Sequence, residues 1–421
     1  MVENMELLPG IQLYTYRDNR FKQGALSIQF VRPMKKEEAA YNALLPAVLL
    51  RGTKAYPDLR AITLRLDDLY GASVSTLVRR IGDYQTTGFY CNFMEDKFAL
   101  DGDEILKPML EFVFQLLLDP VMEDGGFSRD FVESEKKNLI STIEAEKNDK
   151  RVYASGQLMK IMCEGDCFGL SRLGEPEDVK NISAQNLFAH YHRMLKESPV
   201  QLFYVGSAPR ETVAAILKQQ FESLSRDPMR LAPQSSFSGG AGREEEQVMD
   251  VAQAKLCMGF VTPVTNRCED FAAMQVLNAI FGGGMTSKLF MTVREKMSLC
   301  YYIGSSYYGS KGLVTVSAGV DADKVQTARK EIFAQLDACR EGVITKEEMA
   351  AAKEAVLSAL RTVHDSPGAI EGYYATAALS GAPMSPADYA RSVAKVSAED
   401  VVRVAKMLNY HSGFLLKGVE S

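Results

Sequence analysis

Short stretches of alternating or continuous apolar residues recur along the chain and predict its strands. They lie at 11–17, 24–33, 72–80 and 83–93, and then at 254–263, 300–309 and 312–319. Longer stretches with helical periodicity separate and follow these strands. Thr345-x-x-Glu348 and Ser397-x-x-Asp400 have the spacing of capping boxes at helix starts. The pattern predicts an α+β fold, in which helices pack on one face of a mostly antiparallel sheet.

The chain also contains a long internal repeat. LSIQFVRP begins at Leu26 and LCMGFVTP begins at Leu256, 230 positions later. Near the ends of the two halves, ISAQNLFAHYHRML from Ile182 is echoed by VSAEDVVRVAKML from Val396, and each is followed by a predicted strand. Matches in the same order predict two homologous domains, 1–225 and 246–421. Residues 226–245, rich in Pro, Ser, Gly and charge, are expected to be a flexible linker, and the two domains to form a clamshell around a cavity.

Composition excludes several functional classes. The 421 residues are 46% hydrophobic and 24% charged, as in ordinary globular proteins, and the net charge of -6 argues against a nucleic-acid-binding protein. The N-terminal MVENMELLPG lacks the regions of a signal peptide, and no apolar run approaches the roughly 20 residues of a membrane span. Seven scattered cysteines do not suggest a disulfide framework, so a cytoplasmic location is expected.

The residues that most often bind metals or phosphate do not form a recognisable site. His190 and His192 are two apart on a predicted helix, so they point to different sides and are expected to be solvated or packed. CEGDC at 163–167 is a single CxxxC, best explained by two reduced thiols. GGGMTSK at 282–288 lacks phosphate-loop spacing and is expected to end one helix and cap the next through Thr286 or Ser287. The glutamates at 133, 135, 144 and 146 suggest a solvated helix face.

One long segment resembles a known family. GGGMTSKLFMTVREKMSLCYYIGSSYY, residues 282–308, is similar to the second-half signature of the insulinase/pitrilysin zinc peptidases. It is most like the branch that contains the mitochondrial processing peptidase and its small bacterial relatives. The chain length, the order of elements and the duplication also fit that branch, so the resemblance covers essentially the whole chain.

The resemblance implies that the zinc site has been lost. Active members carry HxxEH in the first half, five residues before a Gly-Thr that matches Gly52-Thr53 here. The two histidine positions then fall on Ala43 and Ala47, the catalytic glutamate on Pro46, and the third ligand on Thr142, seven residues after Glu135. In such peptidases zinc lowers the pKa of its bound water to about 7 and the glutamate takes the proton. Alanine and proline can do neither, and no histidine precedes His190 that a register shift could recruit.

The second-half signature is better preserved. In the family, an arginine and a tyrosine of this stretch hold the substrate backbone near the scissile bond, and they match Arg294 and Tyr301. Two positions depart from the family pattern, with Ser298 in place of the usual glycine and Cys300 in place of alanine. Taken without the motif, Arg294 and Tyr301 would suggest only a surface helix residue and a half-buried strand aromatic.

These features predict a catalytically inactive subunit of an insulinase-like zinc peptidase. The expected partner is a homologous HxxEH-bearing subunit that supplies zinc, so this chain is expected to hold no metal or other cofactor and to be inactive alone. The expected substrates are peptides or unfolded proteins that pair as an added strand. The alternative is a non-catalytic structural or peptide-binding module, possibly a homodimer.

Overall fold

In the computed structural model, which describes residues 2–418, the chain divides into two compact units. The first unit comprises 1–144, 170–233 and 364–379, and the second comprises 145–169, 234–363 and 380–421. The units therefore differ from the two contiguous halves, 1–225 and 246–421, that the repeat suggested. Each unit takes one short segment from the other half of the sequence, and the reason lies in how its sheet is covered.

The first unit is built on a six-stranded sheet with strand order β1-β2-β8-β3-β5-β4. All neighbouring strands pair antiparallel except β2 and β8, which are parallel. The strands are β1 (Glu3–Leu8), β2 (Ile11–Arg17), β3 (Gln23–Pro33), β4 (Ser73–Ile81), β5 (Tyr84–Met94) and β8 (Val200–Gly206). A separate two-stranded ribbon is formed by β6 (Met122–Glu123) and β7 (Gly126–Phe127).

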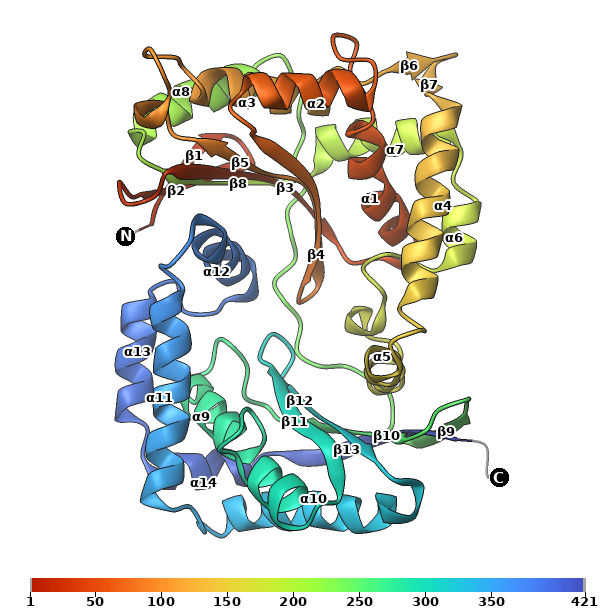
Figure 1. Cartoon of the computed structure of the whole chain (residues 1–421), viewed down its shortest axis with the longest axis vertical. Coiled ribbons are helices and arrows are strands. Elements are labelled where there is room, and N and C mark those ends of the chain that lie inside the picture. Colours follow the sequence, from red (N-terminus) through yellow and green to blue (C-terminus); the bar gives the residue numbers. More distant parts are fainter. Residues whose placement is uncertain (1, 419–421) are drawn as a thin grey trace. The chain divides into compact units, whose positions relative to one another are not determined.

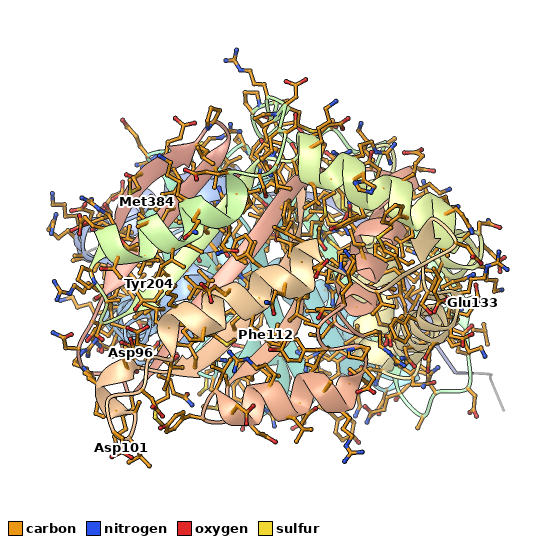
Figure 2. The ribbon with its side chains drawn as sticks, turned by 90° about the horizontal axis from the view of Figure 1, so that it is seen from above. Asp96, Asp101, Phe112, Glu133, Tyr204 and Met384 are labelled. Carbon is orange, nitrogen blue, oxygen red and sulfur yellow. The ribbon has the colours of Figure 1, made fainter. Side chains whose placement is uncertain are left out.

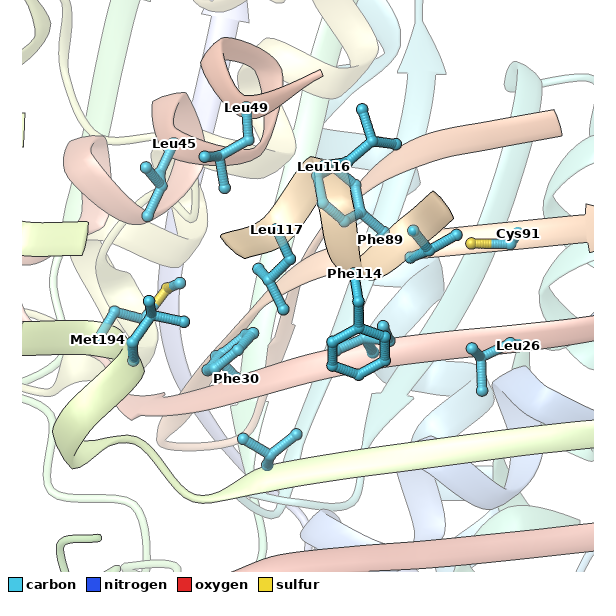
Figure 3. Packing of buried hydrophobic residues seen from close by; sticks show 14 of the residues in the cluster. Leu26, Phe30, Leu45, Leu49, Phe89, Cys91, Phe114, Leu116, Leu117 and Met194 are labelled. Atoms are coloured by element: carbon cyan, nitrogen blue, oxygen red, sulfur yellow. The ribbon is translucent and has the colours of Figure 1, made fainter. Parts of the chain in front are cut away.

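Helices of the first unit cover both faces of this sheet (Figure 1). They are α1 (Lys36–Leu49), α2 (Leu59–Asp68), α3 (Leu106–Leu118), α4 (Arg129–Ala145), α6 (Pro176–Lys180), α7 (Ala184–Glu197), α8 (Arg210–Phe221) and α12 (Pro367–Ser380). Figure 2 looks onto the helical layer, with Phe112 on α3 and Glu133 on α4. Under this layer Leu26, Phe30 and Phe89 of the strands pack against Leu45 of α1 and Phe114 of α3 (Figure 3).

The opposite face of this sheet is covered by α12, which comes from the second half of the sequence. Alternate residues of a strand point to opposite faces, so Ser27 and Gln29 of β3 lie on this side. Both donate hydrogen bonds to Glu371 of α12, at 2.8 and 2.9 Å, and Arg79 of β4 forms an ion pair with the same carboxylate at 2.8 Å. The buried Glu371 carboxylate thus has three partners from the sheet, which fixes α12 on it.

The second unit repeats this plan. Its sheet has the order β11-β12-β10-β13-β9, in which only β13 and β9 are parallel. This is the order β4-β5-β3-β8-β2 of the first sheet with each strand replaced by its counterpart, so the topology confirms the internal duplication. The strands are β9 (Glu244–Val248), β10 (Ala254–Val261), β11 (Cys300–Tyr308), β12 (Leu313–Val320) and β13 (Asn409–Lys417).

The helices of the second unit are likewise shared between two faces. Phe260 of β10 packs against Phe281 of α9 and Phe333 of α10, whereas Cys257, three residues earlier and on the opposite face, packs with α5 from the first half of the sequence. The helices are α5 (Lys150–Met162), α9 (Phe271–Phe281), α10 (Val325–Arg340), α11 (Lys346–Thr362), α13 (Pro386–Lys395) and α14 (Ala398–Lys406). Capping boxes open α11 at Thr345 and α14 at Ser397, as the spacing predicted.

The mostly antiparallel sheets and packed helices confirm the expected α+β class, but helices lie on both faces of each sheet rather than one. The expected linker, 226–245, has no helix or strand before β9, and it is held by hydrogen bonds. Met229 donates its N–H to the Glu197 carbonyl in the first unit, and Gly240 donates to the Glu164 carbonyl in the second. The free linker that its composition suggested is therefore not what the structure contains.

Candidate functional site

The first group of predicted site residues lies on α1. Ala43 and Pro46 are buried and Ala47 is half-buried, so the helix turns methyl groups and a ring toward its neighbours where the family places two imidazoles and a carboxylate. Pro46 lies inside the helix and has no backbone N–H. The Asn42 carbonyl, which would normally accept that N–H, accepts the Thr87 hydroxyl of β5 at 2.6 Å instead. A side chain of the sheet therefore supplies the hydrogen bond that the proline removes.

The Asn42 side chain is the centre of a buried polar network. Its amide nitrogen donates to Gln85 Oε1 at 2.8 Å, and its oxygen lies 2.7 Å from His190 Nε2. Because that oxygen can only accept, His190 carries its proton on Nε2, and its free Nδ1 accepts from Arg193 at 2.9 Å. Burial lowers the pKa of His190 to about 4, so the ring is neutral at pH 7. This histidine has the packing role expected for it.

The fourth degenerate position, Thr142, is exposed on α4. Its hydroxyl donates to the Asn138 carbonyl one turn earlier, at 2.9 Å. Glu135, which marks the family register, forms an ion pair with Arg51 at 3.0 Å. The residues at the four family positions thus offer two methyl groups, a proline ring and a hydroxyl. This donor set does not fit zinc, which takes nitrogen, thiolate or carboxylate ligands.

The second group of predicted site residues belongs to one cavity of the second unit. Arg294 lies in η3, a π-helical segment over Leu289–Lys296, and Tyr301 lies at the start of β11. Both line a hollow of about 350 Å³. The π-helix was not expected, since the sequence suggested an ordinary helix capped by Thr286 or Ser287. Ser287 does accept the Phe290 N–H, at 3.4 Å, while the preceding α9 ends at Gly282.

Local geometry presents both side chains to solvent. The Arg294 guanidinium lies 4.6 Å from the centroid of the Phe290 ring, and its side chain is 40% exposed. Tyr301 occupies a β-bulge, because Cys300 pairs with Val320 while Tyr302 pairs with the adjacent Gly319. The bulge leaves Tyr301 62% exposed on the outer strand of the sheet. Ser298, between the two residues, has φ = 51°, the left-handed conformation for which glycine is usual.

The remaining lining of this cavity carries charges of both signs. Asp321 and Lys324 form an ion pair at 3.0 Å, and hydrogen bonding to Asp321 raises the pKa of Lys324. Glu295 lies 3.6 Å from the Arg294 Nε atom, too far for a strong bond, which leaves the outer guanidinium nitrogens available. Burial raises the pKa of the Cys300 thiol to about 11, so it is not a nucleophile at pH 7. The cavity can therefore hold polar groups of a ligand but has no activated nucleophile.

The sequence did not single out Asn42, Thr87 or Gln85. The sequence could have indicated a role for Asn42, since an asparagine among apolar helix residues must find hydrogen-bond partners when it is buried. The partners themselves lie on β5 and α7, far away in the chain, and could not be read from spacing. Ser298 was noted only as a departure from glycine, and its left-handed backbone explains why glycine is common there.

Comparison with known proteins agrees with this arrangement. Residues 181–356 match the family model described as the Peptidase M16 inactive domain. A Bacillus subtilis protein named "Probable inactive metalloprotease YmfF" is 29% identical over 412 residues, covering 98% of this chain and 96% of the relative. An "Uncharacterized zinc protease" of Rickettsia felis is 22% identical over 300 residues, covering 69% of this chain and 71% of that protein.

Solved structures give the same result for the fold. A conserved protein from Enterococcus faecalis V583 superposes with a TM-score of 0.90 at 26% identity, covering 100% of this chain and 99% of the other. A Pseudomonas fluorescens structure described as a peptidase M16 inactive domain has a TM-score of 0.82 at 18% identity, covering 100% and 98%. Among residues 2–418, no helix combines the length and the apolar character needed to cross a membrane. By these similarities the chain resembles the M16, or insulinase/pitrilysin, peptidases, and the relative that it matches over almost its whole length is described as probably inactive.

Proposed function

We propose that this chain is the non-catalytic subunit of a zinc peptidase complex. In this complex a homologous HxxEH-bearing subunit supplies the zinc ion and the general base. This chain supplies Arg294 and Tyr301, which hold the backbone of a peptide substrate. The observation that supports the proposal is a contrast: the α1 positions have lost every metal donor, whereas Arg294 and Tyr301 line one open cavity.

The neighbouring strand supports a role in peptide binding. β11 pairs only with β12 among the described strands, so no strand occupies its other edge, where the Ser305 N–H already donates to the Gly282 carbonyl at 2.9 Å. An extended peptide can add to such an edge through main-chain hydrogen bonds, which tolerate many sequences. The Tyr301 bulge lies at the beginning of this edge, and the Arg294 guanidinium is available to donate to a peptide carbonyl. The two residues would orient the peptide, while proton transfer would take place on the partner's residues.

The location proposed for the complex is the cytoplasm. None of the seven cysteines, all of which fall within the described residues, forms a disulfide, and five are buried. Reduced thiols of this kind suit a reducing compartment.

The test is to co-purify this chain with an HxxEH-bearing relative from the same genome. Cleavage of a quenched peptide is then followed for each chain alone and for the mixture, with and without a zinc chelator. The proposal expects chelator-sensitive cleavage only in the mixture, and no stoichiometric zinc in this chain by elemental analysis. Arg294→Ala and Tyr301→Phe should reduce cleavage about a hundredfold and tenfold in the mixed complex. The matched control is Lys330→Ala, at an exposed position of α10, and it should leave the rate of cleavage unchanged.

Two results would contradict the proposal. Chelator-sensitive cleavage by this chain alone would mean that it has a metal site of its own. A mixture that fails to associate, or an HxxEH chain that is equally active alone, would favour the alternative of a structural or peptide-binding homodimer. In that case Arg294→Ala would leave the partner's activity unaffected.

A further inference from the structure

A second hollow of the second unit lies next to the Arg294 cavity and shares none of its lining residues. Its volume is about 670 Å³, and it lies where α5 and β10 begin. Its walls come from the first turn of α5, from the loop before β10 and from the ring of Tyr302. The lining residues are Asn148, Asp149, Lys150, Arg151, Asp250, Val251, Ala252, Gln253, Lys255 and Tyr302.

The Tyr302 ring forms part of the wall of this hollow and has close neighbours. It lies against Gly319 of β12, where an added Cβ would come within 2.4 Å of the ring. The glycine therefore provides the space in which the ring lies. Two cations contact the same ring: the Arg151 guanidinium is 4.5 Å and the Lys255 ammonium 5.7 Å from its centroid. Both distances are within the range of cation–π interactions.

These two cations have no anionic partner among residues 2–418, where neither side chain forms an ion pair. Of the two carboxylates that line the hollow, Asp149 accepts the backbone N–H groups of Arg151 and Val152 as the N-cap of α5. The hollow therefore has two carboxylates, one of them committed to the helix cap, against the three cations Lys150, Arg151 and Lys255. Two like charges on one aromatic ring repel each other, and an anion placed between them would relieve this repulsion. The arrangement is therefore complementary to a carboxylate.

The position of the hollow relates it to the open edge of β11. Tyr301 lines the Arg294 cavity and the next residue, Tyr302, lines this hollow. Arg151 also lines a third hollow of about 390 Å³ that continues along β11 past Ser305 and Ser306. Residues of β11 thus line all three hollows, and α5, which carries Arg151, packs on β10 and β13 of that sheet. The Ser305 N–H is bonded to the Gly282 carbonyl, so a strand paired with β11 before Ser305 would pass the first two.

We propose that the hollow around Tyr302 is a specificity subsite that binds an acidic side chain of an extended peptide paired with β11. Arg151 and Lys255 bind the carboxylate, and Tyr302 holds the two cations in place. The inference rests on the proposed function, because it needs a peptide on β11, and it adds a preference for acidic substrates. Arg151 and Lys255 are binding residues here and have no part in proton transfer.

The experiment uses the full chain and four fluorescein-labelled peptides of Ser, Val and Thr. Three are amidated and carry one central Glu, Gln or Lys; the fourth carries Gln and has a free C-terminus. Fluorescence anisotropy gives the affinities for the chain alone and for its mixture with the HxxEH-bearing relative. The Glu peptide should bind about tenfold more tightly than the Gln peptide at low salt, and the difference should shrink at high salt. In Arg151→Gln/Lys255→Gln this difference should disappear, whereas Lys330→Gln should keep it.

Each contrary outcome has a distinct meaning. Equal binding of the Glu and Gln peptides, with both weakened by Arg294→Ala, overturns the subsite and leaves the proposed function standing. If only the peptide with a free C-terminus binds more tightly, the hollow binds a terminal carboxylate, and an acidic side chain is ruled out as its occupant. If none of the peptides binds to the chain or to the mixture, the subsite and the proposed function both fail. A conservative Arg151→Lys variant should retain most of the preference, which distinguishes lost charge from lost folding.

Discussion

The Thr87 hydroxyl donates to the Asn42 carbonyl at 2.6 Å. Asn42 lies in α1, four residues before Pro46. A proline inside a helix leaves the carbonyl four residues earlier without its N–H donor and costs roughly 3 kcal/mol. The strand thus supplies a donor at the one carbonyl that the proline deprives. The helix that matches the catalytic motif of the family is here fixed to β5 by Thr87 and Gln85 and to α7 by His190.

The first prediction concerns the coupling between Thr87 and Pro46. Thr87→Val should lower the free energy of unfolding by about 1–3 kcal/mol, because it leaves a buried carbonyl without a donor. In Pro46→Ala the new backbone N–H satisfies that carbonyl, so Thr87→Val should cost at least about 1 kcal/mol less there. Urea unfolding of the four proteins measures this coupling. Equal costs in both backgrounds would show that Thr87 does not compensate for the proline.

The second prediction concerns pH. The folded pKa of His190, about 4, lies below its unfolded value of 6.5, so between these values the unfolded chain binds more protons. The contribution of neutral His190 to the free energy of unfolding, about 3 kcal/mol, is therefore complete above pH 6.5 and is lost as the pH falls toward 4. His190→Gln should flatten this part of the stability curve, measured by urea unfolding from pH 4 to 8. His192→Gln, on the same helix, is the control and should keep the wild-type slope.

The third prediction concerns a buried ion pair in the second unit. The Lys311 ammonium lies 3.0 Å from Asp166, and their side chains are 0% and 1% exposed. Burial alone would raise the pKa of Asp166, but the Phe168 N–H and the Lys311 charge outweigh it and lower that pKa. Lys311→Met leaves an uncompensated buried carboxylate and should cost about 3–5 kcal/mol in urea unfolding. Lys324→Met, which breaks an exposed pair, should cost less than about 1 kcal/mol; similar losses in both would refute this assignment.

The fourth prediction concerns the turn between Arg294 and Tyr301. A non-glycine residue in the left-handed conformation costs about 1–2 kcal/mol. Glycine removes this cost, but it loses more backbone entropy on folding, which offsets part of the gain. Ser298→Gly should therefore raise the free energy of unfolding by roughly 0.5–1 kcal/mol, whereas Ser298→Val should lower it by more than about 1 kcal/mol. Thermal unfolding separates the two variants. A destabilising Ser298→Gly would show that the serine side chain stabilises this turn.

The sequence predicted most of the secondary structure because that structure depends on local patterns. The strand expected at 11–17 is β2, and the capping boxes at Thr345 and Ser397 open α11 and α14. The duplication was visible because homologous strands keep their apolar positions. The partners of buried polar groups were not visible. Nothing near Glu371 in the chain indicates that Ser27, Gln29 and Arg79 surround it, since those contacts bridge about 300 residues or more.

The sequence predicted the residues of the candidate site but not the local backbone geometry that positions them. The motif placed Arg294 and Tyr301 together because they lie seven residues apart, and both line one cavity. The motif could not show the bulge at Tyr301, which depends on the pairing of β11 with β12, and it did not indicate the π-helix that carries Arg294. Nor could it bring Arg151 of the first half onto Tyr302 of the second.

The placement of α5 and α12 limits how the protein can be divided. A fragment that ends at 225 retains the whole sheet of the first unit but lacks Glu371, so Ser27, Gln29 and Arg79 lose their shared acceptor. A fragment that begins at 246 lacks α5 and exposes Cys257 and its apolar neighbours. Neither half alone therefore contains a complete unit, although the two sheets share one strand order. The two fragments expressed together should complement each other, because each carries the helix that the other needs.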